Sequence, residues 1–158
     1  MPRIDLSSAG VKFKYAVEAT AGTRPTADSA YTALTGVNAI PDLNPEPSSL
    51  QTTTLDEEEY HTYIPGLKDT GGAMSIGANN SEQFQTDWAA MVTACTAANA
   101  DGKSMWFAVV IPGLTKAFYF SGVPSPLGLS AIEVDQVLSI NGYITPSKIA
   151  GWDTKPTA

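Results

Sequence analysis

The alternation of apolar and polar residues near the start of the chain predicts a strand. Within residues 11 to 20, Val11, Phe13, Tyr15 and Val17 occupy alternate positions, with Lys, Ala, Glu or Thr between them. A period of two places such side chains on one face of a strand. We therefore expect a strand with one buried face and with Phe13 and Tyr15 in the core.

Apolar residues at helical spacing mark the middle of the chain. They fall at offsets 0, 4, 7, 8 and 11 and are Phe84, Trp88, Met91, Val92 and Cys95. These offsets share one face of a helix with 3.6 residues per turn. The pattern predicts a helix at about 81–98, capped by Asn80 or Ser81 and packed on a sheet, with Phe84 and Trp88 in the core.

A hairpin is predicted directly after this helix. Met105 to Ile111 is continuously apolar, and a Pro-Gly turn separates it from a second strand that contains Phe118 and Phe120. We place Trp106, Phe118 and Phe120 in the core. Because the first strand has no polar face, both of its sides should be covered, one by the core and the other by the helix or a neighbouring subunit.

The carboxy-terminal part combines one strand with an irregular end. Apolar residues alternate between Ile132 and Ile144, which predicts the last strand of the sheet. Residues 146–158 contain prolines and a glycine that disfavour a regular helix or strand. We expect them to form an extended tail along the surface, with Trp152 as a candidate anchor.

A turn-rich region at about 41–72 separates the two halves. Its first part, 41–49, contains three prolines, Pro41, Pro45 and Pro47. Because proline has no backbone N–H to donate within a sheet, we expect this part to be an extended surface loop. Residues 50–55 favour a short strand. Turn residues at Pro65 and Gly66 then favour a projecting flap with a mobile tip, and residues 73–79 favour a strand that returns to the sheet.

Composition agrees with a β-rich chain. The 158 residues suit a single domain, 1–158, and only 16% are charged, against about 25% in ordinary soluble domains. The predicted fold class is mainly β (α+β): a β-sandwich or barrel of two packed antiparallel sheets, with one flanking helix at about 81–98 and a projecting loop at about 41–72.

Acidic residues are concentrated in the long turn-rich region between Pro25 and Leu67. No Lys or Arg occurs between Pro25 and Leu67, whereas seven acids do: Asp28, Asp42, Glu46, Asp56, Glu57, Glu58 and Glu59. The remaining chain has nine acids and nine bases, so the whole net charge of −7 arises here. Such a region can repel phosphate, repel another copy, or pair with a basic patch, unless it is simply a solvated loop.

The sequence offers little support for catalysis, cofactors or metals. Gly102-Lys103-Ser104 resembles the end of a phosphate-binding loop but stands between a helix and a strand, the reverse of the required order. Glu58 and His61 have metal-ligand spacing without a second cluster, and His61 is the single histidine. We expect no enzymatic activity, no catalytic residue, no cofactor and no metal.

Targeting and membrane signals are also missing from this sequence. The start, MPRIDLSSAG, lacks the apolar run of a signal peptide, and no stretch approaches the ~18 apolar residues that span a bilayer. We expect synthesis in a cytosol without membrane insertion. The one cysteine, Cys95, is expected to be a core thiol.

One segment carries a family resemblance. The string TTTLDEEEYHTYIPGLKDTGG, from Thr52 to Gly72, resembles the signature region of tailed-bacteriophage tail tube proteins, also called major tail proteins. The strings KYAVEATAGTRPT, FQTDW and WFAVVIPGLTKAFYFSGVPSPLG are similar to the same family in the same order. The resemblance spans about residues 10–145.

The resemblance implies a structural virion protein. Such a subunit forms homohexameric rings that stack into a tail tube, a conduit for genome delivery. Its partners would be other copies of itself, a tape-measure protein, a tail terminator and baseplate or tip proteins. It would be made and assembled in the cytoplasm of the bacterial host and reside in the virion tail, and DNA would pass through without specific binding.

The resemblance also implies where rings meet. The loop at about 41–72 would reach the adjoining ring, and residues near the termini would help to lock rings together. The candidate interface residues are Arg24, Pro25, Asp56, Glu57, Glu58, Glu59, Tyr60, Tyr63, Pro65, Gly66, Leu67, Lys68 and Asp69. Acids that face the channel would keep the duplex sliding, since contacts to phosphate would hold it.

Two other functions stay open at this point. A carbohydrate-binding β-sandwich module of a virion or cell surface would use aromatic stacking platforms, for which the candidates are Tyr60, Tyr63 and Trp106 or Trp152. A tube subunit of a contractile injection or secretion system would share the fold and the assembly chemistry.

Overall fold

The structure, a computed structural model, describes residues 7–158 and divides into two compact units. We call residues 7–41 with 73–158 the body, and Asp42–Gly72 the arm. Residues 1–6, part of the amino-terminal segment expected to help lock rings, lie outside the described residues. Within residues 7–158, no helix is both long enough and apolar enough to cross a membrane.

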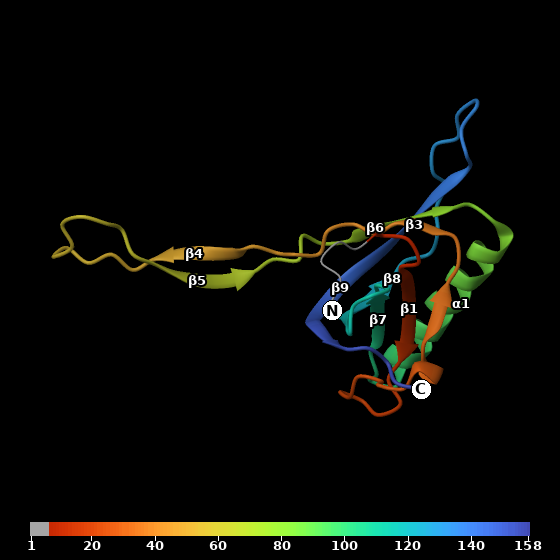
Figure 1. Cartoon of the computed structure of the whole chain (residues 1–158), viewed down its shortest axis with the longest axis horizontal. Helices are drawn as coiled ribbons and strands as arrows, with labels where there is room; N and C mark the ends of the chain where they lie inside the picture. Colours follow the sequence, from red (N-terminus) through yellow and green to blue (C-terminus); the bar gives the residue numbers. More distant parts are fainter. Residues whose placement is uncertain (1–6) are drawn as a thin grey trace. The chain divides into compact units, whose positions relative to one another are not determined.

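The body is built on one seven-stranded antiparallel sheet in the order β2-β1-β7-β8-β9-β6-β3 (Figure 1). Its strands are β1 (Lys12–Val17), β2 (Thr32–Leu34), β3 (Val37–Ala39), β6 (Met74–Asn79), β7 (Met105–Val110), β8 (Lys116–Pro124) and β9 (Ser139–Thr154); a short 3-10 helix, η1 (Asp28–Ala30), precedes β2. The two edge strands, β2 and β3, are joined only by Thr35 and Gly36. Three Cα steps reach at most about 11 Å, so the sheet must curl until its edges nearly meet.

The single predicted helix is present as α1 (Glu82–Ala100). The Ser81 hydroxyl caps it by accepting a hydrogen bond of 3.2 Å from the backbone N–H three residues later. At the other end Gly102 has a φ of +72°, and the N–H of Lys103 donates to the carbonyl of Ala98 at 2.8 Å. This left-handed end satisfies carbonyls that the last turn leaves free. With the antiparallel sheets, α1 confirms the mainly β fold with one flanking helix.

The helix packs on one face of the sheet and completes the core. Trp88 is 1% exposed, and its Nε1 donates to the carbonyl of Ser125 at 2.7 Å. A Cβ at Gly142 would overlap the Trp88 ring, so β9 needs glycine where the indole lies against it. On the same face, the ring of Phe107 stacks on Phe13 and Phe120, with centroids 5.6 and 5.1 Å apart.

Five of the seven residues expected in the core are buried: Phe13, Phe84, Trp88, Trp106 and Phe120. Tyr15 and Phe118 are only half-buried, which corrects the expectation for these two. Tyr15 lies near the edge strand β2, directly opposite Thr32 in the pair β1–β2. Phe118 packs edge-on against Trp152, which is itself half exposed, with centroids 5.5 Å apart.

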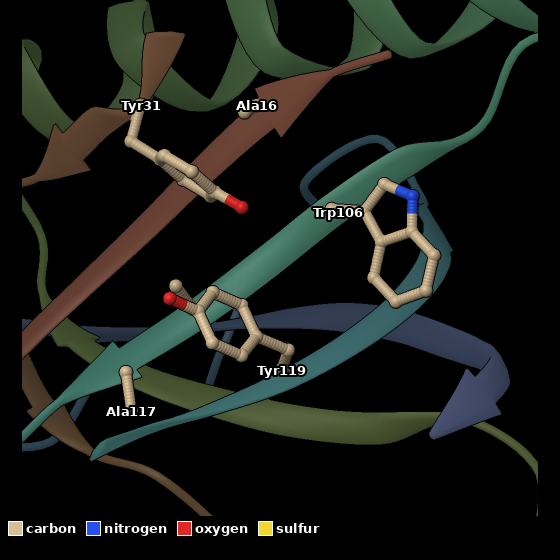
Figure 2. Packing of buried hydrophobic residues seen from close by; sticks show 6 residues of the cluster. Ala16, Tyr31, Trp106, Ala117 and Tyr119 are labelled. Carbon is tan, nitrogen blue, oxygen red and sulfur yellow. The ribbon is translucent and has the colours of Figure 1, made fainter. Parts of the chain in front are cut away.

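A second cluster covers the opposite face of the central strands. It consists of Ala16, Tyr31, Trp106, Ala108, Ala117 and Tyr119 (Figure 2). Tyr31 comes from the irregular segment that follows β1, so this excursion folds back over the sheet. Both faces of the apolar strand β7 are therefore covered within one chain, and the neighbouring subunit that we considered as a cover is not needed there.

The expectation of a single buried face on β1 was wrong for the same reason. Glu18, assigned to the polar side, is only 4% exposed. Its Oε1 accepts from Trp106 Nε1 at 2.8 Å, and its Oε2 accepts from the backbone N–H of Gly22. A buried carboxylate is tolerated when both oxygens are hydrogen-bonded. Glu18 thus holds the excursion against the sheet.

The tyrosine cluster should make the protein sensitive to alkali. Burial raises the pKa of Tyr31 to about 12 from an ordinary value of 10.0, and the neighbouring Tyr119 contributes in the same direction. The Tyr31 hydroxyl also donates to the carbonyl of Pro25 at 2.8 Å. As pH rises, the Tyr31 hydroxyl loses its proton in the unfolded chain before it does so in the folded protein. The contribution of Tyr31 to the free energy of unfolding is therefore complete below pH 10 and is lost as pH rises from 10 to about 12.

We therefore expect the free energy of unfolding to fall less steeply in Tyr31→Phe than in the wild type over this pH range. Urea denaturation at several pH values between 9 and 11.5 measures the two slopes. Some decline should remain, since burial also raises the pKa of Tyr119. Equal slopes in the two proteins would show that Tyr31 ionises as readily when folded as when unfolded.

The carboxy-terminal strand differs from the prediction at both ends. Residues 132–138 are not part of it, and β9 continues to Thr154 through the segment expected to be an irregular tail. Two register shifts against β8 explain this, because they leave extra residues next to Pro146 and Gly151. Bulges accommodate residues that would otherwise break a ladder.

The alternating apolar residues before β9 are therefore exposed instead of buried. Their exposed fractions run from 46% at Leu138 to 88% at Val134. The group consists of Leu129, Ile132, Val134, Val137 and Leu138. Alternation alone does not show which segments find a strand partner, and this segment finds none among the described residues.

The arm is a two-stranded antiparallel ribbon of β4 (Pro47–Gln51) and β5 (Tyr63–Lys68) (Figure 1). Pro47 and Pro65 occur within strands, which corrects the predicted loop at 41–49 from residue 47 onward and the predicted turn at Pro65 and Gly66; Pro45 lies in the irregular chain before β4. Each strand of a two-stranded ribbon has a free edge, where a proline need not donate a hydrogen bond. A Cβ at Gly66 would collide with the Ser48 hydroxyl and crowd the Ser48 carbonyl at 3.2 Å, so glycine eases the close approach of the two strands.

Candidate assembly surface

The arm exposes apolar side chains along its whole length. Leu50 and Ile64 pair directly across the ribbon on one face, and Tyr63 lies opposite Gln51 on the other. The exposed set comprises Leu50, Leu55, Tyr60, Tyr63, Ile64 and Leu67, with exposed fractions from 50% to 107%. An isolated two-stranded ribbon is marginally stable in water, and exposed apolar groups of this kind mark interaction sites.

Hydrogen bonds continue the ribbon beyond the ends of its strands. The backbone N–H of Thr52 donates to the carbonyl of Thr62 at 2.8 Å, and the N–H of Thr62 donates to the Thr53 hydroxyl at 2.9 Å. The side chains of Gln51 and His61 lie 3.0 Å apart between Nε2 and Nδ1. The polar ladder therefore carries the ribbon to a short tip at 54–60.

Four consecutive acids, Asp56 to Glu59, occupy that tip. The N–H of Glu57 donates to the carbonyl of Thr54 at 3.2 Å and closes the turn. Hydrogen bonds from the Thr54 side chain and from its own backbone hold the pKa of Asp56 below the usual value. Leu55 beside them is fully exposed. The tip thus presents one apolar side chain next to a row of carboxylates.

Charge divides unequally between the two units. The arm has seven acids and one base, Lys68, which gives a net charge of −6. The rest of the chain has nine acids and eight bases, which gives −1. Two arms should repel each other, whereas an arm and a basic region of another body should attract.

Eleven of the thirteen candidate interface residues lie in the arm. Asp56, Glu57, Glu58, Glu59 and Tyr60 form the tip, Tyr63, Pro65, Gly66, Leu67 and Lys68 lie in β5, and Asp69 follows β5. The Asp69 carboxylate accepts a hydrogen bond from the N–H of Gly71 at 2.9 Å. The structure brings this group together on one ribbon, and their interface roles stay predictions.

The other two candidates, Arg24 and Pro25, belong to the body. The Arg24 guanidinium lies 4.0 Å from the centroid of the Tyr119 ring and forms an ion pair of 2.7 Å with Asp153. This hydrogen bond is the largest reason that the pKa of Asp153 is lowered. Arg24 therefore already fastens the excursion after β1 to the end of β9.

The aromatic residues considered as stacking platforms are not equally available. Trp106 is 6% exposed and its indole N–H is bonded to Glu18, so it cannot receive a sugar ring. Tyr60, Tyr63 and Trp152 are 72%, 58% and 52% exposed. Trp152 and Lys116 together line a hollow on the body. The sequence could not show this, because the two residues are brought together by the register of β8 with β9.

Comparison with known proteins identifies the fold but no family. No family model matches the sequence, and no curated protein matches it. Among solved structures, the chain is similar to one in the cryo-EM structure of the anti-feeding prophage (AFP) baseplate, 6-fold symmetrised, with a TM-score of 0.57 and 7% identity. The likeness covers 96% of this chain and 95% of that chain. At this identity the likeness shows a shared fold.

Proposed function

We propose that the protein is a structural virion subunit that forms hexameric rings and stacks them into a tail tube for genome delivery. The observation that carries this proposal is the arm, an acidic ribbon whose apolar side chains have no cover of their own. Burial of these side chains against another copy would stabilise both the ribbon and the contact. Assembly, and not catalysis, is the activity.

The charge of the arm favours a particular kind of contact. Since two arms with a net charge of −6 each repel, the arm should dock on the body of another copy. A contact between two different surfaces of identical subunits is heterologous, and it generates closed rings or open stacks. Both geometries are required to build a tube from rings.

The structural neighbour supports a six-fold assembly. It belongs to a baseplate that was 6-fold symmetrised, and the present chain shares its fold over nearly the full length of both. The same observation favours a second candidate, a tube or baseplate ring of a contractile injection system. Single rings that do not stack would indicate the baseplate function, whereas stacks of indefinite length would indicate a tube.

The other proposed partners follow from the tube. A tape-measure protein would set its length, and a tail terminator and baseplate or tip proteins would close its ends. In the particle the protein would reside in the tail after assembly in the host cytoplasm. A net charge of −7 per subunit disfavours tight binding to phosphate, which suits a conduit through which DNA passes without specific binding.

Reversing the charge of the tip tests this function. We expect a variant with Lys in place of Asp56, Glu57, Glu58 and Glu59 to lose stacked assemblies, because its tip would repel the basic surface that it should bind. Sedimentation velocity measures the assembled fraction, and circular dichroism checks the fold. Asp101→Lys with Glu133→Lys, both exposed positions of the body, is the control and should assemble. Normal assembly of the tip variant would contradict the function assigned to the tip.

A further inference from the structure

A hollow on the body combines an exposed tryptophan with a lysine. It has a volume of about 270 Å³ and is lined by Leu114, Thr115, Lys116 and Trp152. Trp152 is 52% exposed even though its ring packs edge-on against Phe118. The hollow is therefore largely apolar and open to solvent.

Two lysines lie at this end of the sheet. Lys116 opens β8 opposite Thr154, and the backbone N–H of Lys155 donates to the carbonyl of Thr115 at 3.3 Å. No carboxylate of residues 7–158 lies within ion-pairing distance of either ammonium group. Asp153, which lies opposite Ala117 and two residues before Lys155, is engaged by Arg24 at 2.7 Å. Of the two lysines, Lys116 lines the hollow. It forms no ion pair within residues 7–158, although its charge lies near enough to Asp153 to help lower the pKa of that carboxyl.

We propose that this hollow receives the arm tip of an adjacent copy. Leu55 would enter the hollow against Trp152 and Leu114, and the carboxylates at 56–59 would pair with Lys116 and Lys155. The inference rests on the proposed function, which requires arm-to-body contacts, and it adds the receiving surface. Its support is complementarity: an exposed leucine beside four acids matches an apolar hollow lined by Lys116, with Lys155 at the same end of the sheet.

The proposed contact explains two separate features of the sequence. It gives the arm tip a reason to place a fully exposed leucine next to a charge run. It also accounts for a half-exposed tryptophan at the end of a long strand. Because ion pairs at a solvated rim are screened by salt, assembly should weaken as ionic strength rises.

A charge swap tests the contact. Lys116→Glu with Lys155→Glu should raise the protein concentration needed for assembly by about tenfold or more, the change that 1.4 kcal/mol per contact produces. The variant with Lys at 56–59 should fail similarly. Combining both sets of changes in one chain should restore assembly, because the attraction is then rebuilt with opposite signs. Lys12→Glu with Lys148→Glu, which reverses two exposed lysines elsewhere on the body, is the matched control and should assemble normally.

Cross-linking gives a second measurement that does not depend on charge. Thr54→Cys with Thr115→Cys, which leaves Leu55 and Trp152 in place, should form disulfide-linked multimers on oxidation of assembled protein, whereas Thr54→Cys with Leu129→Cys should not. The native Cys95 is buried and does not compete. If the wild type assembles but the swap fails to rescue and no cross-link forms, the receiving surface is elsewhere and this inference is overturned. A wild type that never assembles would instead overturn the proposed function.

Discussion

Deletion of the arm should abolish assembly and leave the body folded. All of the buried hydrophobic residues lie in the body, so the core loses nothing when residues 42–72 are removed. The strands on either side pair with each other, with Ala39 opposite Gly77, and a short Asn-Gly-containing turn can connect them. Replacing the 31-residue arm by about four residues should even stabilise the body by about 1–2 kcal/mol, because closing a shorter loop costs less conformational entropy.

Two measurements separate assembly from stability in this deletion. Size-exclusion chromatography with light scattering should report a monomer at concentrations where the full chain forms large species. Urea denaturation should give a free energy of unfolding equal to or above that of the full chain. Rings or tubes formed by the armless body would contradict the function of the arm, and an unfolded body would contradict the division into two units.

Trp88→Ala should be the most destabilising single substitution in the body. Removal of a buried Trp side chain costs about 3–5 kcal/mol, a large part of the ~5–15 kcal/mol that stabilises an ordinary domain. Trp88 also donates a hydrogen bond of 2.7 Å to Ser125 and fills the space above Gly142. Its loss would uncouple α1 from the sheet and from the segment after β8.

The matched control is the same change at the half-exposed tryptophan. Trp152→Ala should cost clearly less stability than Trp88→Ala, because about half of the Trp152 side chain is already exposed to solvent. Chemical denaturation of both variants gives the comparison. A loss below 1 kcal/mol for Trp88→Ala would mean that the helix is not part of the core. Trp152→Ala should nevertheless impair assembly, which distinguishes a contact residue from a core residue.

The helix and most strands of the body were predictable because their patterns are local. Phe84, Trp88 and Cys95 repeat at helical spacing, and the apolar run from Met105 needs no tertiary information. The prediction failed where burial depends on distant segments. Glu18 is buried because the segment after β1 folds back over the sheet. The backbone N–H of Gly22 and the indole N–H of Trp106 then both donate to its carboxylate. The periodicity along β1 does not reveal these distant partners.

The carboxy-terminal strand shows the opposite failure. Residues 132–138 have the alternation of a strand but remain exposed, while residues 146–154 lack it and form the second half of β9. Pro146 and Gly151 are residue types that usually interrupt a β-strand. In the structure they lie next to bulges against β8, and the ladder continues past them. Pairing between distant strands decided the outcome in both segments.

The candidate assembly surface was predictable in part. The concentration of acid in the projecting segment, and the position of Asp56 to Glu59 within it, are visible in the sequence. The tip geometry is not, because it depends on the register that places Leu50 opposite Ile64. The receiving hollow was out of reach for the same reason, since Lys116 and Trp152 are far apart in sequence and meet only through β8 and β9.

Cryo-EM of the purified full-length protein tests the central claim most directly. We predict hollow stacks of six-subunit rings, with each arm tip on the body of a neighbouring copy and a bore that is not lined by lysine and arginine. Dispersed single subunits at every protein and salt concentration, or a bore rich in basic side chains, would contradict it.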